Sequence, residues 1–515
     1  MVGSLDRSLW VRAILFVGFA CGVSLLVWSR VERTAYAAEP LDAMLVTMVL
    51  VIVAISIFNL NLPQTQDRNG RVLLIFGGIL FHLWFARLVG IMVEGSNFPP
   101  DYQFLLVPMA LAPMVHSVLL SPRAGVFSAL FVSMFGALLM PAGEELIYLG
   151  VSLICGLTAV YATVQVRKRG RLLRAGFYVG AAALVLDLVF GKIGIEMINE
   201  WGPMAWQAFG TRCLAAFGSG ILTGLLVSGV LPLLEGAFRL TTDITWLEAS
   251  DLNHPLLRRL QLEAPGTFHH SLVVASLAEA AAEEIGAQAL MCRVCSYFHD
   301  IGKLKKPEYF IENQGEHNPH DTLTPTMSAL IIVAHVKDGV DMAINHRLNG
   351  RIIEGIQEHH GDSLVYYFYR RAIERAQAAV EKSGSDDLPC VDEKSFRYPG
   401  PIPRSRESGI ISLADAVESA SRTIKKPTPS KIKTLIDEIT FNRLKDGQLD
   451  ECGLTMAELT KVKAVFAKTL RSMLHARVDY PKEKTEEAAS DLGLKVVPAE
   501  EVERARRLRT AEGKT

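Results

Sequence analysis

Residues 289–304 read ALMCRVCSYFHDIGKL and place the dipeptide His299-Asp300 near the end of an apolar run with helical periodicity. Gly302 is suited to end this helix, because glycine tolerates the backbone conformations that commonly close a helix. The run lacks the alternation of apolar and polar residues that is typical of a half-buried strand. The sequence therefore predicts a helix that presents an imidazole and a carboxylate together at its C-terminal end.

Four further stretches with helical periodicity carry histidine or aspartate in the same half of the chain. They are HHSLVVASLAEAAAEEIG (269–286), SALIIVAHVKDGVDMAI (328–344), GRIIEGIQEHHG (350–361) and GIISLADAVESASR (409–422). Alternation with a period of two residues is scarce throughout this half. We therefore predict an all-α domain.

The histidines and aspartates of these five stretches suggest a metal site. The candidate ligands are His270, His299, Asp300, His335, His359, His360 and Asp415. Imidazole nitrogen and carboxylate oxygen suit first-row cations such as iron, manganese and zinc, and two cations ~3.5–4 Å apart can activate a hydroxide and clamp a phosphodiester. A single buried histidine is usually a satisfied core residue, but two dyads and three single residues on successive helices fit that explanation poorly. The set predicts a two-metal site in which Asp300 is shared.

The N-terminal half of the chain has a different composition. The 515 residues are 50% hydrophobic, and residues 1–240 hold long apolar runs with sparse charge. Eight of these runs approach the ~20 residues that a helix needs to span a bilayer. They lie at 10–28, 42–62, 72–93, 103–120, 124–141, 145–165, 174–195 and 209–233. We predict a polytopic transmembrane helix bundle of about eight spans, with the main boundary near Glu235.

The sequence predicts that the chain is divided into five segments. An N-terminal anchor helix and a short outer loop occupy residues 1–41, and a seven-helix transmembrane domain occupies residues 42–233. A juxtamembrane linker at 234–264 leads to the all-α domain at 265–480. Residues 481–515 form a charged tail.

Loop charges predict the orientation of the bundle. The connection 166–174, VRKRGRLLR, holds five basic residues, whereas the loops 94–102 and 142–144 hold none. Because positive charge stays on the cytoplasmic side, we expect the N-terminus and the all-α domain to face the cytoplasm. The loop 29–41 is discordant, since it carries Arg30 and Arg33 on the predicted outer side. A cleaved signal peptide is the alternative for the first segment, but the sequence lacks a good cleavage site there.

Several further residues allow both a structural and a functional interpretation. His82, Arg87, His116, Asp187 and Lys192 lie inside the predicted spans, where ionisable groups are costly; pairing within the bundle is favoured over a ligand or transport role. Cys292 and Cys295 form a CxxC with no second cysteine pair, so core packing is favoured over redox or zinc chemistry. No phosphate-binding loop or dinucleotide fingerprint is present.

The motifs resemble a known family. The pattern HHS…HDIGK…H…HHG…D is similar to that of the HD superfamily of metal-dependent phosphohydrolases. Longer strings resemble the membrane-anchored seven-transmembrane HD phosphodiesterases of the PgpH type. These strings are PLLEGAFRLTTDITWLEASDLNHPLLRRL (232–260), EAPGTFHHSLVVASLAEAAAEEIGA (263–287), YFHDIGKLKKPEYFIENQ (297–314), NPHDTLTPTMSALIIVAHVKDG (318–339) and EHHGDSLVYYFYRRA (358–372). The resemblance covers roughly residues 43–475.

The resemblance implies an activity, cofactors and residue roles. The activity would be hydrolysis of cyclic di-AMP to the linear dinucleotide at a centre of two divalent metal ions, iron or manganese, on the cytoplasmic side of a bacterial inner membrane. One metal would be held by His270, His299, Asp300 and Asp415, and the other by Asp300, His335, His359 and His360. Lys303 would face a substrate phosphate; the alternative is a solvated lysine at a helix end.

Two departures and several alternatives stay open at this point. Members of the family typically carry a large extracellular sensor domain after the first span, for which residues 29–41 are too few. The second departure is the segment 381–408, a polar loop rich in proline and glycine.

The alternative functions are hydrolysis of an alarmone or cyclic di-GMP, a non-catalytic nucleotide receptor, and a transporter. The expected partners are a cyclic dinucleotide and the lipid bilayer, with no nucleic-acid polymer, and a homodimer is one option for the assembly.

Overall fold

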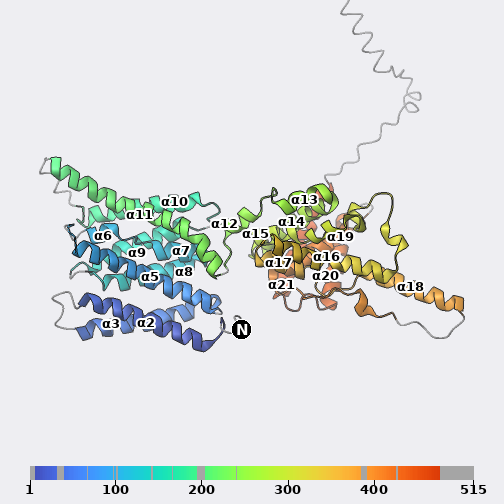
Figure 1. Ribbon diagram of the computed structural model, residues 1–515, viewed down its shortest axis with the longest axis horizontal. Helices are drawn as coiled ribbons and strands as arrows, with labels where there is room; N and C mark the ends of the chain where they lie inside the picture. The colour runs from blue at the N-terminus through green and yellow to red at the C-terminus, as the bar shows by residue number, and fades with distance from the viewer. Residues whose placement is uncertain are drawn as a thin grey trace, which may run out of the picture. The chain divides into compact units, whose positions relative to one another are not determined.

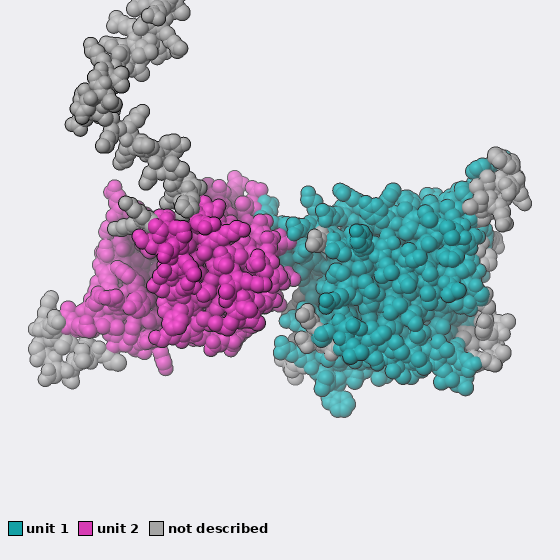
Figure 2. All heavy atoms as spheres, turned by 180° about the vertical axis from the view of Figure 1, so that it is seen from behind, with its two compact units in different colours: residues 1–251 teal, residues 252–515 magenta. Residues whose placement is uncertain are grey.

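The computed structural model shows an all-α protein. It describes residues 6–31, 40–66, 68–96, 98–99, 102–140, 143–164, 166–193, 203–238, 240–383, 391–424 and 427–475. Within these ranges every regular element is a helix, apart from one isolated bridge between Leu364 and Arg397. The chain divides into two compact units, residues 1–251 and 252–515 (Figure 2). The all-α prediction is confirmed, and the division falls inside the predicted linker.

The first unit consists mainly of apolar helices that follow the predicted segments, together with short helices such as α4 and α12 that the sequence did not predict. They are α2 (Leu9–Val31), α3 (Pro40–Asn61), α4 (Pro63–Gln66), α5 (Asn69–Glu94), α6 (Tyr102–Leu106), α7 (Leu111–Leu119), α8 (Pro122–Ala137), α9 (Glu145–Ala162), α10 (Gly170–Val189), α11 (Pro203–Phe238) and α12 (Asp243–Ala249) (Figure 1). In the described ranges, 7 helical segments are long and apolar enough to cross a membrane, with α6 and α7 counted together. The remaining predicted span, the fifth at 124–141, forms α8, whose 16 residues extend only about 24 Å.

Helices α10 and α11 are held together by direct contact between their backbones. A Cβ atom on Gly220 of α11 would lie 2.2 Å from the backbone nitrogen of Gly180 on α10 and 2.7 Å from the carbonyl oxygen of Gly176. Only a residue without a side chain fits there, as in the small-residue interfaces that let helices approach closely in membranes.

Most of the charged groups inside this unit find partners within it. Glu94 accepts ion pairs from Arg30 at 2.8 Å and from Arg87 at 3.1 Å, while Lys192 pairs with Glu144. Arg30, one of the two arginines of the discordant loop 29–41, is therefore held in an ion pair inside the unit. The imidazole of His116 is bonded to the hydroxyl of Ser128 and to the carbonyl of Leu74.

His82 and Asp187 are less completely satisfied. The Nδ1 atom of His82 accepts a long hydrogen bond of 3.4 Å from the Ala112 amide, and its Nε2 atom has no partner in the described part of the chain. The Oδ1 atom of Asp187 is likewise buried there without a hydrogen bond. Internal pairing therefore accounts for Arg87, His116 and Lys192 but only in part for these two residues.

The second unit is a separate helical bundle. Its helices are α13 (Pro255–Glu263), α14 (Pro265–Glu284), α15 (Ala289–Phe298), α16 (Pro325–Asn345), α17 (Gly350–Glu358), α18 (Tyr366–Ser383), α19 (Arg406–Ser421), α20 (Pro429–Lys445) and α21 (Met456–His475), and short 3-10 turns include η3 (Ile301–Lys305) (Figure 1). Capping residues fix several of the starts. For example, the Thr324 hydroxyl accepts a hydrogen bond from the Met327 amide before α16, which satisfies one of the donors that a helix start leaves free.

Gly302 has a different role from the predicted one. Helix α15 ends at Phe298, before this glycine, so Gly302 does not end the helix. It lies in η3 against α16, where a Cβ atom would be 1.8 Å from the carbonyl oxygen of His335. The missing side chain lets α16 approach the His299-Asp300 segment.

Cys292 and Cys295 lie in the core of this unit. Both side chains are buried and both thiols are free. Burial is the largest cause of the raised pKa of each thiol, which keeps the thiols protonated and unreactive. The core-packing interpretation of the CxxC is therefore confirmed.

Candidate metal centre

Five helices of the second unit, α14, α15, α16, α17 and α19, bring the seven predicted ligands together. His270 lies on α14, His335 on α16 and Asp415 on α19. The two dyads, His299-Asp300 and His359-His360, directly follow the ends of α15 and α17. One group of possible ligands consists of Asp300, His335, His359 and His360, and a second consists of His270, His299 and Asp415.

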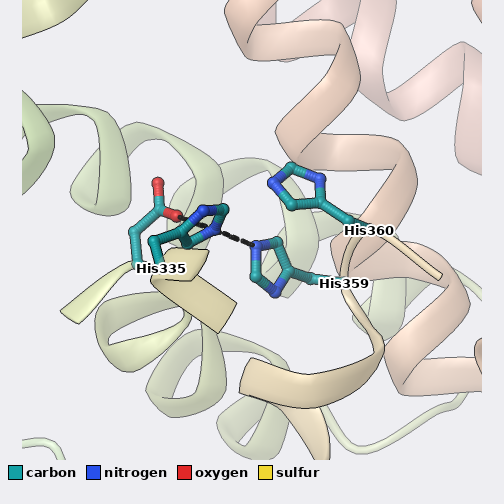
Figure 3. A group of neighbouring side chains, drawn as sticks. His335, His359 and His360 are labelled. Carbon is teal, nitrogen blue, oxygen red and sulfur yellow. Dashed lines mark hydrogen bonds and ion pairs between the residues drawn. The ribbon is translucent and has the colours of Figure 1, made fainter. Parts of the chain in front are cut away.

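In the first group the donor atoms converge on a common point. They lie within 4.8 Å of one another, and in Figure 3 the rings of His335 and His359 point toward each other, with His360 beside them. The Nε2 atoms of His335 and His359 are 3.4 Å apart. Six of the seven ligands are buried, and His360 is partly exposed.

Asp300 connects the two groups, because its two carboxylate oxygens face different histidines. The Oδ2 atom lies 3.2 Å from the Nε2 atom of His299 and 3.5 Å from that of His270. The Oδ1 atom lies 3.3 Å from the Nε2 atom of His335 and 3.7 Å from that of His359. A carboxylate placed in this way has one oxygen available to each group.

Asp415 makes a second connection across the centre. Its Oδ1 atom lies 3.1 Å from the Nε2 atom of His270, and its Oδ2 atom lies 3.5 Å from the Nδ1 atom of His360. Both aspartates therefore contact the histidine cluster and supply negative charge to it.

The backbone fixes the protonation pattern of three of the histidines. The Nδ1 atoms of His299, His335 and His359 lie 2.7, 2.5 and 2.7 Å from the carbonyl oxygen of the residue three positions earlier. A carbonyl oxygen only accepts hydrogen bonds, so each Nδ1 atom carries the proton. In the neutral ring the Nε2 atom then keeps its lone pair, which is the arrangement of a metal-ligating histidine.

Glu418 accepts the corresponding Nδ1 hydrogen bond from His270. This residue was not predicted from the sequence. Its carboxylate is hydrogen-bonded to the Nδ1 atom of His270, and it also accepts a hydrogen bond of 2.8 Å from Arg422. Glu418 follows Asp415 by three residues on α19, so the helical spacing of these two acids was the signal that could have found it.

The residues fit a bound metal. The Nε2 atoms of His270 and His299 and the Oδ1 atom of Asp300 are buried and make no hydrogen bond within the described part of the chain. Burial of such polar atoms without partners is costly, and their lone pairs converge with those of the other ligands. Nitrogen and carboxylate donors together suit divalent first-row cations.

The electrostatics of the pocket favour positive charge. Burial alone would lower the pKa of His299, but the carboxylates of Asp300 and Asp415 outweigh it and raise the pKa to about 10. On the other side of Asp300, burial and the neighbouring His299 lower the pKa of His359 to about 3. The half of the centre around His299 therefore attracts a cation strongly, while the ring of His359 stays neutral and its Nε2 atom has no proton for a metal to displace.

Lys303 lies inside the centre and not in solvent. Its Nζ atom is 2.7 Å from the Oδ2 atom of Asp300 and 2.8 Å from the Oε1 atom of Glu312, and its side chain is 12% exposed. The alternative of a solvated lysine at a helix end is therefore wrong. A role toward a substrate phosphate stays a prediction.

Comparison with known proteins places this centre in a family. Residues 38–242 match the family described as 7TM receptor with intracellular HD hydrolase, and residues 267–420 match the HD domain. The chain belongs to this family of multi-pass membrane proteins that carry an HD domain.

Individual relatives agree with this placement. The chain is 32% identical over 451 residues to the cyclic-di-AMP phosphodiesterase PgpH of Bacillus subtilis, covering 86% of this chain and 60% of the relative. It is 34% identical over 438 residues to the protein of the same name from Listeria monocytogenes, covering 84% of this chain and 58% of the relative. The chain thus spans about 60% of the length of these relatives.

A solved structure also matches the second half of the chain. The crystal structure of the L. monocytogenes PgpH HD domain in complex with cyclic di-AMP is 42% identical, covers 43% of this chain and 98% of its own, and has a TM-score of 0.39. In the present chain only residues 32–39 separate α2 from α3, so the chain has no room for a folded domain between these helices.

Proposed function

We propose that this protein is a membrane-bound, metal-dependent phosphodiesterase that hydrolyses the cyclic dinucleotide cyclic di-AMP to the linear dinucleotide. The observation that carries the proposal is the position of Asp300, whose two oxygens face two separate groups of ligands. The two curated relatives named cyclic-di-AMP phosphodiesterases support the choice of substrate.

Two divalent cations, iron or manganese, are proposed as cofactors. His270, His299 and Asp415 would hold one with Asp300, and His335, His359 and His360 would hold the other with the same aspartate. Such a pair, when bound, supplies an activated water and offsets the negative charge of a phosphodiester during in-line attack.

The remaining residues of the centre orient these ligands and the substrate. The carbonyl partners of His299, His335 and His359 and the carboxylate of Glu418 hold the four rings in place. The ammonium group of Lys303 has three N–H donors, of which Asp300 and Glu312 take two. The third donor is proposed to bind a non-bridging phosphate oxygen of the substrate, where a cation stabilises developing negative charge.

The proposed location is a bacterial inner membrane with the HD domain in the cytoplasm. The basic residues at the start of α10 support this orientation. They are Arg167, Lys168, Arg169, Arg171 and Arg174, and because α10 and α11 each cross the membrane once, they lie on the same side of the bundle as the chain that follows α11. The N-terminus lies on this side as well if α8 also crosses. A short helix such as α8 can cross where the bilayer thins locally or where the helix lies inside the protein, and most of α8 is buried.

Turnover by the purified full-length chain tests the proposal. In detergent with Mn²⁺ or Fe²⁺, cyclic di-AMP should be converted to the linear dinucleotide, while cyclic di-GMP and an alarmone should be consumed more slowly. Faster consumption of either competitor would overturn the choice of substrate. Tight binding of cyclic di-AMP without any product would favour a receptor in place of an enzyme.

A further inference from the structure

A groove lies beside the metal centre in the second unit. Its volume is about 580 Å³, within the range of about 300–1,000 Å³ that is typical of small-ligand pockets. It is lined by Ser363, Leu364, Tyr366, Arg397, Ile439, Asn442, Arg443 and Asp446. We refer to it as the Arg443 groove.

The Arg443 groove shares a wall with the ligand set. The backbone carbonyl of His360 accepts a hydrogen bond of 3.4 Å from the Nη1 atom of Arg443 and one of 2.7 Å from the hydroxyl of Ser363. The imidazole of the same His360 faces Asp415 at 3.5 Å. Two residues that line the groove therefore contact the backbone of a residue whose imidazole belongs to the ligand set.

The opposite side of the centre offers far less room. A cavity beside His270, bordered by Lys303 and Arg422, has a volume of about 60 Å³, which suffices for a few water molecules. A nucleoside does not fit there. Of these two cavities, only the Arg443 groove can hold the part of a dinucleotide that extends beyond the centre.

Arg443, one of the two arginines that line the groove, has N–H donors that no described residue accepts. A guanidinium group carries five N–H donors, and among the described residues Arg443 uses them only for the His360 carbonyl, with no ion pair. Its neighbour Arg397 differs, because it is held by Asp446 at 3.0 Å and by Glu393 at 2.8 Å. Arg443 is therefore the groove residue that is free to bind an anion.

The other walls suit a nucleobase. The ring of Tyr366 is 63% exposed, and Leu364 and Ile439 add apolar surface beside it. Aromatic side chains bind bases by stacking, and arginine adds its charge. The exposed amide of Asn442 supplies a donor and an acceptor for a base edge. An anion site next to an aromatic platform has the chemistry of a nucleotide site.

We propose that the Arg443 groove binds the second nucleotide unit of the substrate, with Arg443 on the phosphate that is not attacked and Tyr366 stacked on a base. This inference rests on the proposed function, since a cyclic dinucleotide has two phosphates and only one can occupy the metal centre. The groove then selects dinucleotides over simple phosphodiesters.

Steady-state kinetics of the Mn²⁺-loaded full-length chain test the groove. Arg443→Ala is expected to raise the KM for cyclic di-AMP by at least about tenfold, with Arg443→Lys intermediate because it keeps the charge. Tyr366→Ala is expected to raise the KM several-fold, and Tyr366→Phe to restore it because the stacking surface remains. Arg370→Ala, which removes an exposed arginine outside the groove, is the matched control and should not change the KM.

A second substrate separates binding in the groove from support of the metal centre. Bis(4-nitrophenyl) phosphate has a single phosphate, so Arg443→Ala should reduce kcat/KM for cyclic di-AMP far more than for this compound. Equal losses on both substrates, or a loss of bound manganese, would show that Arg443 only supports His360 and would overturn the proposal. An unchanged KM for cyclic di-AMP in both alanine variants would overturn it as well.

The groove and the proposed function can fail separately. Binding of AMP to the Mn²⁺-loaded chain, measured by calorimetry, should weaken about tenfold in Arg443→Ala even if the wild type does not cleave cyclic di-AMP. That pair of results would refute the proposed hydrolysis of cyclic di-AMP but would support nucleotide binding in the Arg443 groove. Cleavage of cyclic di-AMP combined with equal AMP affinity in the two proteins would overturn the groove alone.

Discussion

Gly302 and His335 are in backbone contact, since a Cβ atom on the glycine would lie 1.8 Å from the carbonyl oxygen of His335. Gly302→Ala should therefore push α16 away from Asp300 and destabilise the second unit by about 3 kcal/mol or more, at the upper end of the cost of overpacking. Thermal unfolding and bound metal measure the effect. Gly315→Ala is the control, because a Cβ there has nothing within 4 Å. Equal stability of the two variants would show that the contact is unimportant.

Glu418→Ala should weaken metal binding without unfolding the protein. The carboxylate orients His270 through the Nδ1 atom, and loss of such an outer partner typically costs 10–100-fold in affinity or activity. A metal titration followed by activity should show this shift, with turnover partly restored at high Mn²⁺. Glu438→Ala on α20 is the control. If Glu418→Ala binds Mn²⁺ as tightly as the wild type, the orienting role is refuted.

Gly220→Val should separate α10 from α11 in the membrane unit. The new side chain would start 2.2 Å from the Gly180 nitrogen, so neither helix can keep its position. We expect a lower melting temperature in detergent and a lower yield from membranes. Gly218→Val on the same helix has open space around its Cβ and should behave like the wild type. Similar melting temperatures for the two variants would contradict the close packing.

Cys292 and Cys295 should resist alkylation in the folded protein. Both thiols are buried and their pKa is raised, so little thiolate exists at pH 8 and reagent has no access. Mass spectrometry after iodoacetamide treatment should find both residues unmodified until denaturant is added. Modification of either residue in the native protein at the rate of an unfolded control would refute this interpretation.

The sequence predicted the helical fold and named the seven candidate ligands that the structure brings together, because each of them lies on a stretch with a clear helical period. Its failures came from tertiary contacts. Gly302 looked like a helix end, whereas its role depends on α16, a segment more than twenty residues away. Glu418 looked like one more charge on a helix surface, since its partner His270 is 148 residues distant.

The end of the fifth predicted transmembrane span could not be predicted from hydropathy alone. Residues 138–140 are apolar like the segment before them, so hydropathy extends the fifth span through them. The structure ends α8 at Ala137 and places these residues in a turn. Apolar composition reports burial and does not distinguish a helix from a buried turn.

Turnover and metal content of Asp300→Asn test the central claim most directly. The substitution keeps the size of the side chain but removes the charge and one of the two oxygens that face the ligand groups. The wild type should bind two Mn²⁺ ions per chain and release the linear dinucleotide from cyclic di-AMP. Asp300→Asn should hold fewer ions and lose more than about 100-fold in turnover, beyond the loss expected of an outer residue. Turnover at the wild-type rate in Asp300→Asn would contradict the account of a shared aspartate at a two-metal centre.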